Sequence, residues 1–251
     1  MIQLNQYQYI TKNKDTLSDK PRNEDNIYLI TQIFLHSDPA RRLEILQSLK
    51  RNIQLEYFSL IYLLNEQIFT KEELDLNENE FKKIKQINIR QRLKFCTAFN
   101  MISKLGLKGY VVISNCDIFF DKTLNNLRKS CLSISPSIYT LLRFEYLNEK
   151  KLGYCKLCIE PKNNLPRNDS QDTWIIHTNY QPSQDIIKNL DFYFGRPGCD
   201  NKLSFVFQVN GYTCYNEPWK IKSYHHHKTS LRNYTILDRI PPPYLQVIPI
   251  I

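Results

Sequence analysis

Glycine is scarce in this chain of 251 residues, which has only six: Gly106, Gly109, Gly153, Gly195, Gly198 and Gly211. None of them forms a Gly-X-Gly-X-X-Gly or Walker-type loop, the glycine-rich turns that approach phosphates in dinucleotide-binding and P-loop proteins. The sequence therefore disfavours a dinucleotide-binding Rossmann enzyme and a P-loop NTPase.

The cysteines form no disulfide framework. There are seven, an odd number, and they are scattered along the chain. This usage argues for reduced thiols in a cytosolic compartment. Cys155 and Cys158 form one Cys-X-X-Cys, but no second pair accompanies them, so a four-ligand structural zinc site lacks ligands.

Long apolar runs are also lacking. None approaches the ~18 residues of a membrane span, and the N-terminus has no signal-peptide pattern. We therefore expect a soluble, cytoplasmic protein. The Lys- and Asn-rich composition hints at an AT-rich genome, such as that of a virus or protist, and a viral source would place the protein in the host cytoplasm.

The chain is long enough for one full-sized domain, and we expect a single domain over residues 1–251. Its composition, with 42% hydrophobic and 12% aromatic residues, is typical of a globular protein. The net charge of +9 favours anionic partners, which include nucleic acids, phospholipid headgroups and nucleotide-sugar diphosphates. Charge alone does not choose among them.

The most informative stretch is Tyr110 to Asp121. An apolar run, Tyr110–Ile113, predicts a strand buried on both faces, and a polar Ser-Asn-Cys-Asp sequence at 114–117 ends it. Ligands of open α/β sheets bind at this carboxyl edge, where Asp117 could hold Mg²⁺ or Mn²⁺. The simpler alternative for Asp117 is a loop cap. Asp121 is expected to be the N-cap of a helix from Lys122 to Cys131.

These residues resemble the Asp-X-Asp region of glycosyltransferases with the GT-A fold, with Asn115-Cys116-Asp117 in its place. Asn115 stands at the first acidic position, so it is not expected to act as a charged ligand. The resemblance implies an α/β fold with a mixed, mainly parallel sheet flanked by helices. It also implies a nucleoside-diphosphate sugar (UDP-, GDP- or TDP-linked) as donor and Mn²⁺ or Mg²⁺ as cofactor.

The first half of the chain predicts a β-α-β unit. Ile27–Leu35 and Phe58–Leu64 are expected strands, and Ser37-Asp38-Pro39 is an N-cap signal for a helix over Ala40–Ile53. Such a unit implies a parallel pair of strands with a right-handed crossover. An acidic loop, Lys71–Glu80, follows.

A basic run leads into a predicted helix over Gln91–Leu105; its cations are Lys82, Lys83, Lys85, Arg90, Arg92 and Lys94. A solvated basic face explains such a run most simply. The resemblance implies that one or two of these cations approach the diphosphate. Arg92, expected just inside the helix, is the preferred residue.

Beyond the central strand, Ser137–Tyr146 and Tyr154–Glu160 are expected strands, and residues 162–170 a loop. A polar triplet then runs into an apolar strand containing one of only two tryptophans. Asp172 could bind an acceptor hydroxyl and Trp174 could stack on a sugar ring. Both could equally be turn and core residues.

Asp200 is the expected catalytic base. A strand at Phe192–Gly195 and a turn precede it, and a helix over Asn201–Val209 follows, so Asp200 stands at a helix N-terminus. Its simpler role is a cap, but the helix dipole would also keep its carboxylate ionised and ready to accept a proton. In inverting GT-A enzymes an acidic residue at such a helix start is the base. Asp172 is the second candidate.

A run of three histidines ends a strand expected over Lys220–His227, which follows another at Tyr212–Tyr215. In an extended strand His225 and His227 project to one face and His226 to the other. The run could be surface composition. The resemblance implies that one of His225 and His227 binds the metal held by Asp117.

The resemblance also implies basic residues after the histidines that neutralise the departing diphosphate, a role matched by Lys228 and Arg232. It spans Ile27–Tyr234 and divides the domain into a nucleotide-sugar half (about 27–135) and an acceptor half (about 136–234). A proline-rich tail at 238–251 should wrap the surface or meet another subunit.

The expected function is therefore a metal-dependent, inverting glycosyltransferase that acts on a glycan or glycoconjugate acceptor. Two other classes stay open. A metal-dependent phosphoesterase would need more clustered carboxylates for two metals. A non-catalytic basic nucleic-acid-binding protein, which we regard as the weaker alternative, predicts salt-sensitive binding without a metal requirement.

Overall fold

A computed structural model of the chain describes residues 8–146, 156–162, 164–229, 231 and 234–250. Its centre is a seven-stranded sheet in which neighbouring strands are parallel, except that β10 runs antiparallel to both of its neighbours. In spatial order the strands are β11 (Thr213–Tyr215), β7 (Ser137–Leu142), β10 (Gln171–His177), β5 (Gly109–Ser114), β2 (Asn26–Thr31), β3 (Phe58–Asn65) and β4 (Ile84–Asn88). The expected mixed, mainly parallel α/β fold is confirmed.

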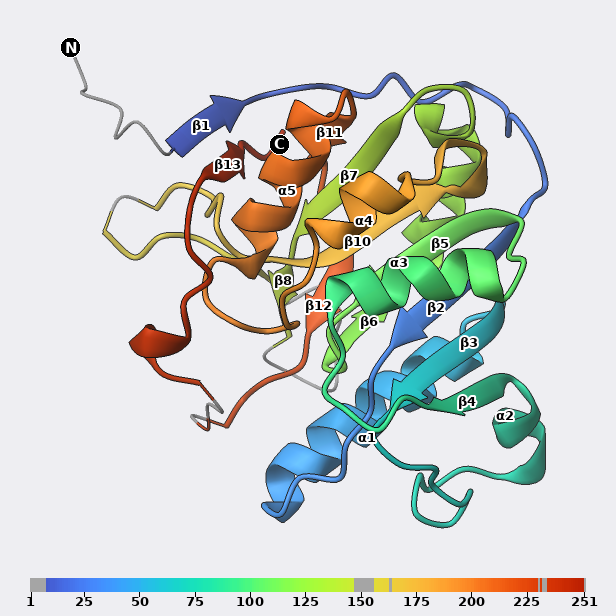
Figure 1. The fold of residues 1–251 in the computed structure, drawn as a ribbon. Coiled ribbons are helices and arrows are strands. Elements are labelled where there is room, and N and C mark those ends of the chain that lie inside the picture. Colours follow the sequence, from blue (N-terminus) through green and yellow to red (C-terminus); the bar gives the residue numbers. More distant parts are fainter. Residues whose placement is uncertain (1–7, 147–155, 163, 230, 232–233, 251) are drawn as a thin grey trace.

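Helices cover both faces of this sheet, because successive side chains of its buried strands point to opposite sides. In β5, Val111 and Ile113 join the core under α3, α4 and α5, whereas Tyr110 and Val112 join the core under α1. Figure 1 shows α3, α4 and α5 in front of the sheet. The helices are α1 (Pro39–Gln54), α2 (Glu78–Lys82), α3 (Phe95–Lys104), α4 (Gln184–Lys188) and α5 (Cys199–Val209).

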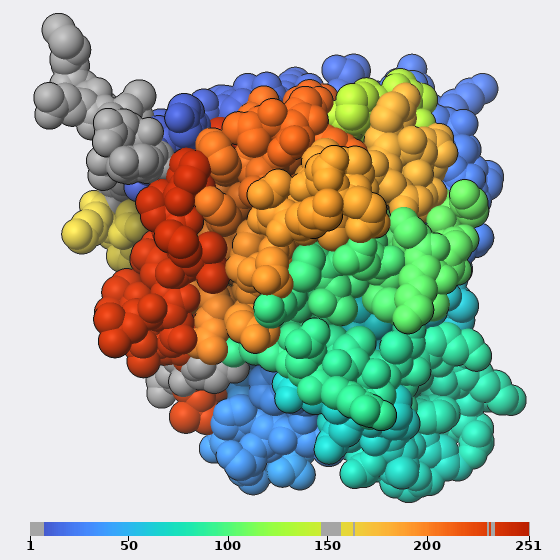
Figure 2. All heavy atoms as spheres, in the orientation of Figure 1, coloured from blue at the N-terminus to red at the C-terminus, as the bar shows by residue number. Residues whose placement is uncertain are grey.

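Two small sheets complete the fold. One has the order β6-β12-β8-β9, with bounds Ile118–Phe120, Ser223–His225, Phe144–Glu145 and Lys156–Leu157. The other pairs β1 (Gln8–Thr11) with β13 (Tyr244–Val247) in parallel. The C-terminal segment, red in Figure 2, lies along α5 of the same chain. The tail therefore packs against its own chain, and Leu245 and Val247 of β13 join the core under α5.

Short 3₁₀ helices connect these elements, at η1 (Lys122–Lys129), η2 (Cys131–Ser133), η4 (Thr178–Tyr180) and η5 (Ile236–Asp238). Asp121 is the N-cap of η1, because its Oδ1 accepts a hydrogen bond from Thr123 N at 2.9 Å. The predicted helix and its cap are present, but the helix ends at Lys129 and is a 3₁₀ helix. The segment forms i→i−3 bonds instead, such as the one from Leu124 N to Asp121 O.

The first β-α-β unit is confirmed. Asp38 caps α1 by accepting from Arg41 N at 2.9 Å, and Pro39 occupies the first turn. A cap of this kind stabilises a helix by about 1 kcal/mol. The first strand is shorter than predicted, because β2 ends at Thr31. The next residue, Gln32, leaves the strand and hydrogen-bonds through its side chain to Leu93 N at 2.9 Å.

Two predicted boundaries fail for local backbone reasons. The strand predicted over 137–146 breaks at Arg143, since Leu142 N donates to the Asn216 side chain at 2.8 Å rather than continuing β7. The helix predicted from Gln91 begins only at Phe95, after Arg90 adopts a positive φ of 57°. Part of the basic run forms the edge strand β4 instead.

Three further predictions need adjustment. The strand expected at Phe192–Gly195 is reduced to a single bridge between Tyr193 and Lys94. The strand expected at 154–160 is seen only as β9, and its first residues lie outside those described. The strand expected to reach His227 ends at His225. Among the described residues, no helix combines the length and apolar character that a membrane crossing requires.

Candidate active site

The carboxyl ends of the parallel strands β2, β3 and β5 meet at one edge of the central sheet, and β10 begins there. A cavity of about 820 Å³ opens at this edge. Its walls come from the β2–α1 segment, the residues after β5, the start of β10, the N-terminus of α5 and the histidine segment. The sequence-predicted residues that line it are Arg92, Asn115, Asp117, Asp172, Asp200, His225 and His227.

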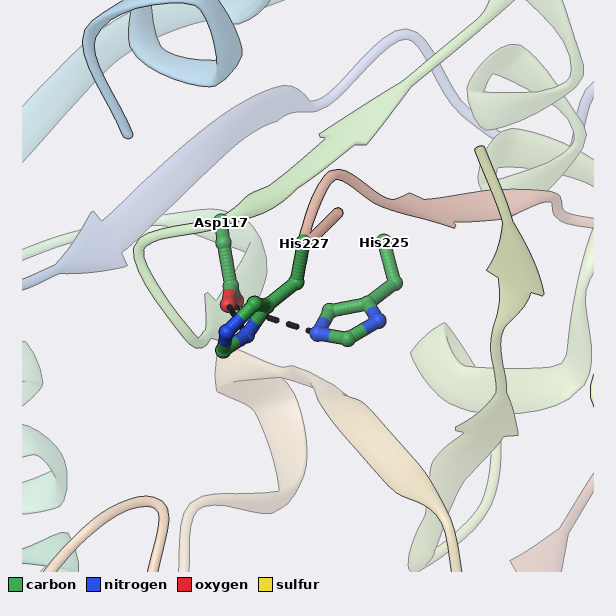
Figure 3. A group of neighbouring side chains, drawn as sticks. All are labelled: Asp117, His225 and His227. Carbon is green, nitrogen blue, oxygen red and sulfur yellow. Dashed lines mark ion pairs between the residues drawn. The ribbon is translucent and has the colours of Figure 1, made fainter. Parts of the chain in front are cut away.

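Asp117, His225 and His227 converge at the cavity wall (Figure 3). Asp117 Oδ2 lies 3.3 Å from His225 Nε2 and 3.4 Å from His227 Nδ1. One potential ligand atom from each residue lies within 4.8 Å of the others. In the part of the chain that the structure describes, this is the only group of three or more His, Cys, Asp or Glu side chains placed to hold a metal.

The predicted alternation of the histidines is correct, although the strand ends earlier than expected. His225 is the last residue of β12, and His226 N then donates to Asp117 O at 2.8 Å, which fixes the histidine segment against the loop after β5. The ring of His226 turns away and meets Tyr146 with centroids 4.9 Å apart. His225 and His227 therefore both reach Asp117, where the sequence had left the choice between them open.

Arg41 of α1 holds the other side of Asp117. Its Nη2 lies 2.5 Å from Asp117 Oδ2, and its Nη1 donates to Glu44 Oε2 at 2.9 Å and to His226 O at 3.2 Å. Glu44 Oε1 in turn accepts from Lys228 N at 2.8 Å. The first helix thus clamps the histidine segment through two buried, paired charges.

These contacts set the ionisation of the cluster. Burial alone would raise the pKa of Asp117, but His225, His227 and Arg41 hold it well below its usual range. Burial lowers the pKa of His225, but the charge of Asp117 together with the hydrogen bonds to Asp117 and Glu145 raises it to about 9. His225 is therefore protonated at neutral pH in this structure, and a cation that binds here takes the place of that proton.

A second layer of charges supports the histidine. Glu145 is the register partner of His225 across β8 and β12, and its Oε2 lies 2.9 Å from His225 Nδ1. Arg143 bonds Glu145 Oε1 at 2.8 Å and Asp172 Oδ2 at 2.5 Å. Asn115 Nδ2 donates to Asp172 Oδ1 at 2.6 Å. Both carboxylate oxygens of Asp172 are therefore engaged by the protein.

Asp200 lies across the cavity as the second residue of α5. Its Oδ1 accepts from Asn201 N at 2.9 Å and its Oδ2 from Gln171 N at 3.4 Å. Burial, together with the charges of Asp172 and Asp169, raises its pKa to about 7. The helix dipole was expected to keep Asp200 ionised at neutral pH, but burial disfavours the charge, and a pKa of about 7 leaves the carboxylate only partly ionised there.

Arg92 lines the cavity, but it precedes α3 rather than lying inside the helix. Its Nη2 donates to Phe194 O at 2.8 Å. Burial and the nearby charge of Arg196 lower its pKa. Arg196 Nη1 also lies 2.8 Å from Asp238 Oδ1. Arg92 and Arg196 together still give this part of the wall positive charge, which suits an anionic ligand.

Three sequence-predicted residues lie elsewhere. Trp174 is fully buried, with its ring 4.7 Å from that of Phe95 and 5.7 Å from that of Phe194, so it offers no face to a sugar. The exposed Lys228 is not among the described residues that line the cavity. Arg232 lies outside the described residues.

Sequence reasoning missed Arg41, Arg143 and Glu145. Arg41 stands in the first turn of α1, the helix that follows β2 after a short connection. Ligand sites gather at the carboxyl edge where this helix begins, which suggested a site residue there but not the contact with Asp117. Arg143 and Glu145 gave no such signal, because they read as alternate residues of one long strand. The break after Leu142 turns them toward the cavity and the histidine.

No family model matches the chain, and no curated protein sequence matches it. A mannosyltransferase from Pyrobaculum calidifontis, solved in complex with GDP-mannose and Mn²⁺, is similar with a TM-score of 0.54 and 11% identity. The match covers 87% of this chain and 62% of that one, so this chain spans less than two thirds of the mannosyltransferase.

A weaker likeness, with a TM-score of 0.42 and 12% identity, is to 4-diphosphocytidyl-2C-methyl-D-erythritol synthase from Anaerococcus prevotii, over 86% of this chain and 93% of that one. At such identities the comparisons concern the fold alone. The likeness to the mannosyltransferase shows that this chain has a GT-A-like fold.

Proposed function

We propose that this protein is a metal-dependent glycosyltransferase that transfers a sugar from a nucleoside-diphosphate sugar to an acceptor hydroxyl, with inversion at the anomeric carbon. The convergence of Asp117, His225 and His227 at the carboxyl edge of a GT-A-like sheet carries this proposal. The donor of the similar mannosyltransferase, GDP-mannose, supports the substrate class.

The three residues fit one divalent cation. They offer one carboxylate oxygen and two imidazole nitrogens from largely buried side chains. The nitrogens favour a transition metal such as Mn²⁺ over Mg²⁺, which prefers oxygen ligands. Asp117, His225 and His227 would hold this cation, which when bound neutralises charge on the departing diphosphate.

Donor binding is assigned to the nucleotide-sugar half, about 27–135. Arg92 is proposed to approach the diphosphate, supported by its place in the cavity lining and by the repulsion from Arg196 that an anion would relieve. Asn115 would contribute through its amide oxygen, since its Nδ2 is bonded to Asp172. Lys228 and Arg232 stay proposed to neutralise the departing diphosphate. Lys228 is held beside the histidine segment, because its backbone N–H donates to Glu44 Oε1 at 2.8 Å.

Asp200 is proposed as the base. The acceptor proton passes to its carboxylate while the acceptor oxygen bonds to the anomeric carbon. The bond from that carbon to the diphosphate breaks on the opposite face, and its electron pair leaves with the diphosphate. Asp200 is preferred to Asp172 because both oxygens of Asp172 already accept hydrogen bonds from side chains of the protein.

Thermal-shift screening with UDP-, GDP- and TDP-sugars, with and without Mn²⁺, tests the proposal. One donor should stabilise the protein only when Mn²⁺ is present, by roughly 2.7 kcal/mol at about 100 times its dissociation constant. With that donor, an acceptor should cause nucleoside-diphosphate release and a product of inverted anomeric configuration by NMR. The absence of any metal-dependent stabilisation would contradict the proposal.

The same protein should be incubated with Mn²⁺ and bis(p-nitrophenyl) phosphate. Hydrolysis of this diester without sugar transfer would identify a phosphoesterase instead. We do not favour that outcome, because a two-metal site needs further carboxylates and the described residues contain no second cluster. Salt-sensitive binding of nucleic acid without Mn²⁺ would support the basic binding protein.

A further inference from the structure

Two buried side-chain amides in the cavity wall lack hydrogen-bond partners. Neither Gln171 Nε2 nor Gln171 Oε1 finds a partner among the described residues, and the same holds for Asn201 Oδ1. Gln171 is 2% exposed and Asn201 is 7% exposed. Of the described residues with partnerless buried side-chain atoms, these two are the ones that line the cavity.

Both amides belong to residues that contact Asp200. Gln171 N and Asn201 N donate to its carboxylate, so the backbone holds these two residues directly against the proposed base. Buried polar groups without partners cost folding free energy, and native proteins retain them where a ligand or function explains the loss. Here the cost falls at the point where an acceptor must lie.

We propose that Gln171 and Asn201 bind hydroxyl groups next to the one that Asp200 deprotonates, so that the acceptor is a sugar ring with neighbouring free hydroxyls. This inference rests on the proposed function, and it adds two residues that would bind the acceptor and the neighbouring hydroxyl groups that they would recognise. An amide both donates and accepts hydrogen bonds, and so does a sugar hydroxyl. Two amides beside one carboxylate therefore match a polyol better than an isolated alcohol.

The amide atoms are closed off from water in this structure, so binding requires them to turn toward the cavity. The terminal torsions of glutamine and asparagine are broad, which makes a rotation of the amide plane easy. Gln171 Nε2, Gln171 Oε1 and Asn201 Oδ1 make no hydrogen bond to any described residue. Turning these atoms toward the cavity therefore breaks no hydrogen bond of theirs within the described protein.

Protein stability gives the first test. Methionine is close in shape to glutamine and lacks the polar amide, so Gln171→Met should leave the unfolding midpoint unchanged or raise it by about 2 °C. Gln86 on β4 is the matched control. Its Oε1 accepts a hydrogen bond from Phe69 N, and its Nε2 donates one to Phe69 O. Gln86→Met should lower the midpoint. If Gln171→Met lowers it as much, the amide has a structural partner and the proposal fails.

Sugar binding gives the second test. Methyl glycosides of mannose, glucose and galactose are titrated by saturation-transfer NMR, with and without Mn²⁺ and GDP or UDP. At least one should bind, and Gln171→Met and Asn201→Leu should each weaken it about tenfold, as expected for a lost hydrogen bond in a buried site. Gln208→Leu, an exposed amide on α5, should change nothing.

The two proposals fail in different ways. If Mn²⁺ and the nucleoside diphosphate bind but no methyl glycoside does, or the variants bind it as wild type does, the sugar acceptor is wrong and the donor site stands. If Mn²⁺-dependent nucleotide binding is absent, the proposed function is wrong. Should Asn201→Leu fail to fold, Asn201→Ala replaces it in the same titration.

Discussion

Asp117 and Asp200 are buried aspartates of one cavity, yet their surroundings shift their pKa values in opposite directions. Burial raises both, but His225, His227 and Arg41 hold the pKa of Asp117 well below its usual range. Asp200 meets only backbone N–H groups and further negative charge, and its pKa rises to about 7.

The difference separates two kinds of chemistry. A carboxylate that stays charged at every physiological pH suits a cation, whereas one poised near neutrality suits proton transfer. The same contrast extends to the neighbours. Around Asp117 the charged groups are paired with one another, and around Asp200 two amides are without partners among the described residues.

Replacement of Asp200 should have the largest effect on turnover. Asp200→Asn should lower kcat by about 10²-fold or more with donor affinity nearly unchanged, since proton removal occurs only on the way to the transition state. In the wild type, kcat/KM should rise with pH through about 7 and then level off, because a protonated Asp200 cannot accept a proton.

Asp172→Asn is the matched comparison and should mainly raise the acceptor KM. Steady-state kinetics from pH 5.5 to 9 with fixed donor would separate the two residues. A large kcat loss in Asp172→Asn with near-normal kcat in Asp200→Asn would transfer the role of base to Asp172.

The histidines should act on the other wall. His225→Ala and His227→Ala should each weaken Mn²⁺ binding in the presence of GDP, by an amount approaching 100-fold for a lost ligand. His226→Ala is the control, because its ring packs against Tyr146 and only its backbone contacts Asp117. Electron paramagnetic resonance of free Mn²⁺ would give the affinities. If His226→Ala weakens Mn²⁺ binding more than His225→Ala and His227→Ala do, the proposed metal cluster is wrong.

Glu145→Gln should give a smaller loss on the same wall. Its carboxylate orients the imidazole of His225 from Nδ1, at 2.9 Å, so the amide should weaken Mn²⁺ affinity by about tenfold without removing a ligand. Glu73→Gln, an exposed change outside the cavity lining, serves as the control. Unchanged Mn²⁺ affinity in Glu145→Gln would show that His225 is oriented by the backbone alone.

Asn115 lies at the boundary between the walls, where its Nδ2 donates a 2.6 Å hydrogen bond to Asp172 Oδ1. An aspartate at position 115 would replace this donor with a second carboxylate, which would repel Asp172. Asn115→Asp should therefore destabilise the fold by about 1–3 kcal/mol, and adding Asp172→Asn should restore part of that loss. Urea unfolding of the two single variants and the double variant measures the coupling. Additive effects would contradict the pairing.

Local sequence signals predicted much of the cavity wall around Asp117. A buried run ending in polar residues located Asp117 at the edge of the sheet, and strand alternation separated His226 from His225 and His227. The Ser-Asp-Pro signal located α1. These inferences succeeded because each depends on a few neighbouring residues.

The features that the sequence did not predict depend on packing between segments that are far apart in the chain. Arg41 reaches Asp117 across 76 positions of sequence, and no local pattern reveals that contact. Trp174 is on an expected strand, but its burial depends on Phe95 and Phe194. The pKa of Asp200 was misjudged because a helix dipole is visible in sequence, whereas desolvation is a property of the folded cavity.

The central claim is that Asp117 holds the cation for the donor while Asp200 acts only in transfer, and Mn²⁺-dependent affinity for GDP and UDP tests it most directly. Calorimetric titrations should compare wild type, Asp117→Asn, Asp200→Asn and Asp121→Asn, the last changing a helix cap. We expect Asp117→Asn to lose about 100-fold or more, because an amide keeps the shape but not the charge. Asp200→Asn and Asp121→Asn should stay within about threefold of wild type, which is less than 1 kcal/mol. Equal Mn²⁺-dependent affinity in wild type and Asp117→Asn would contradict the account.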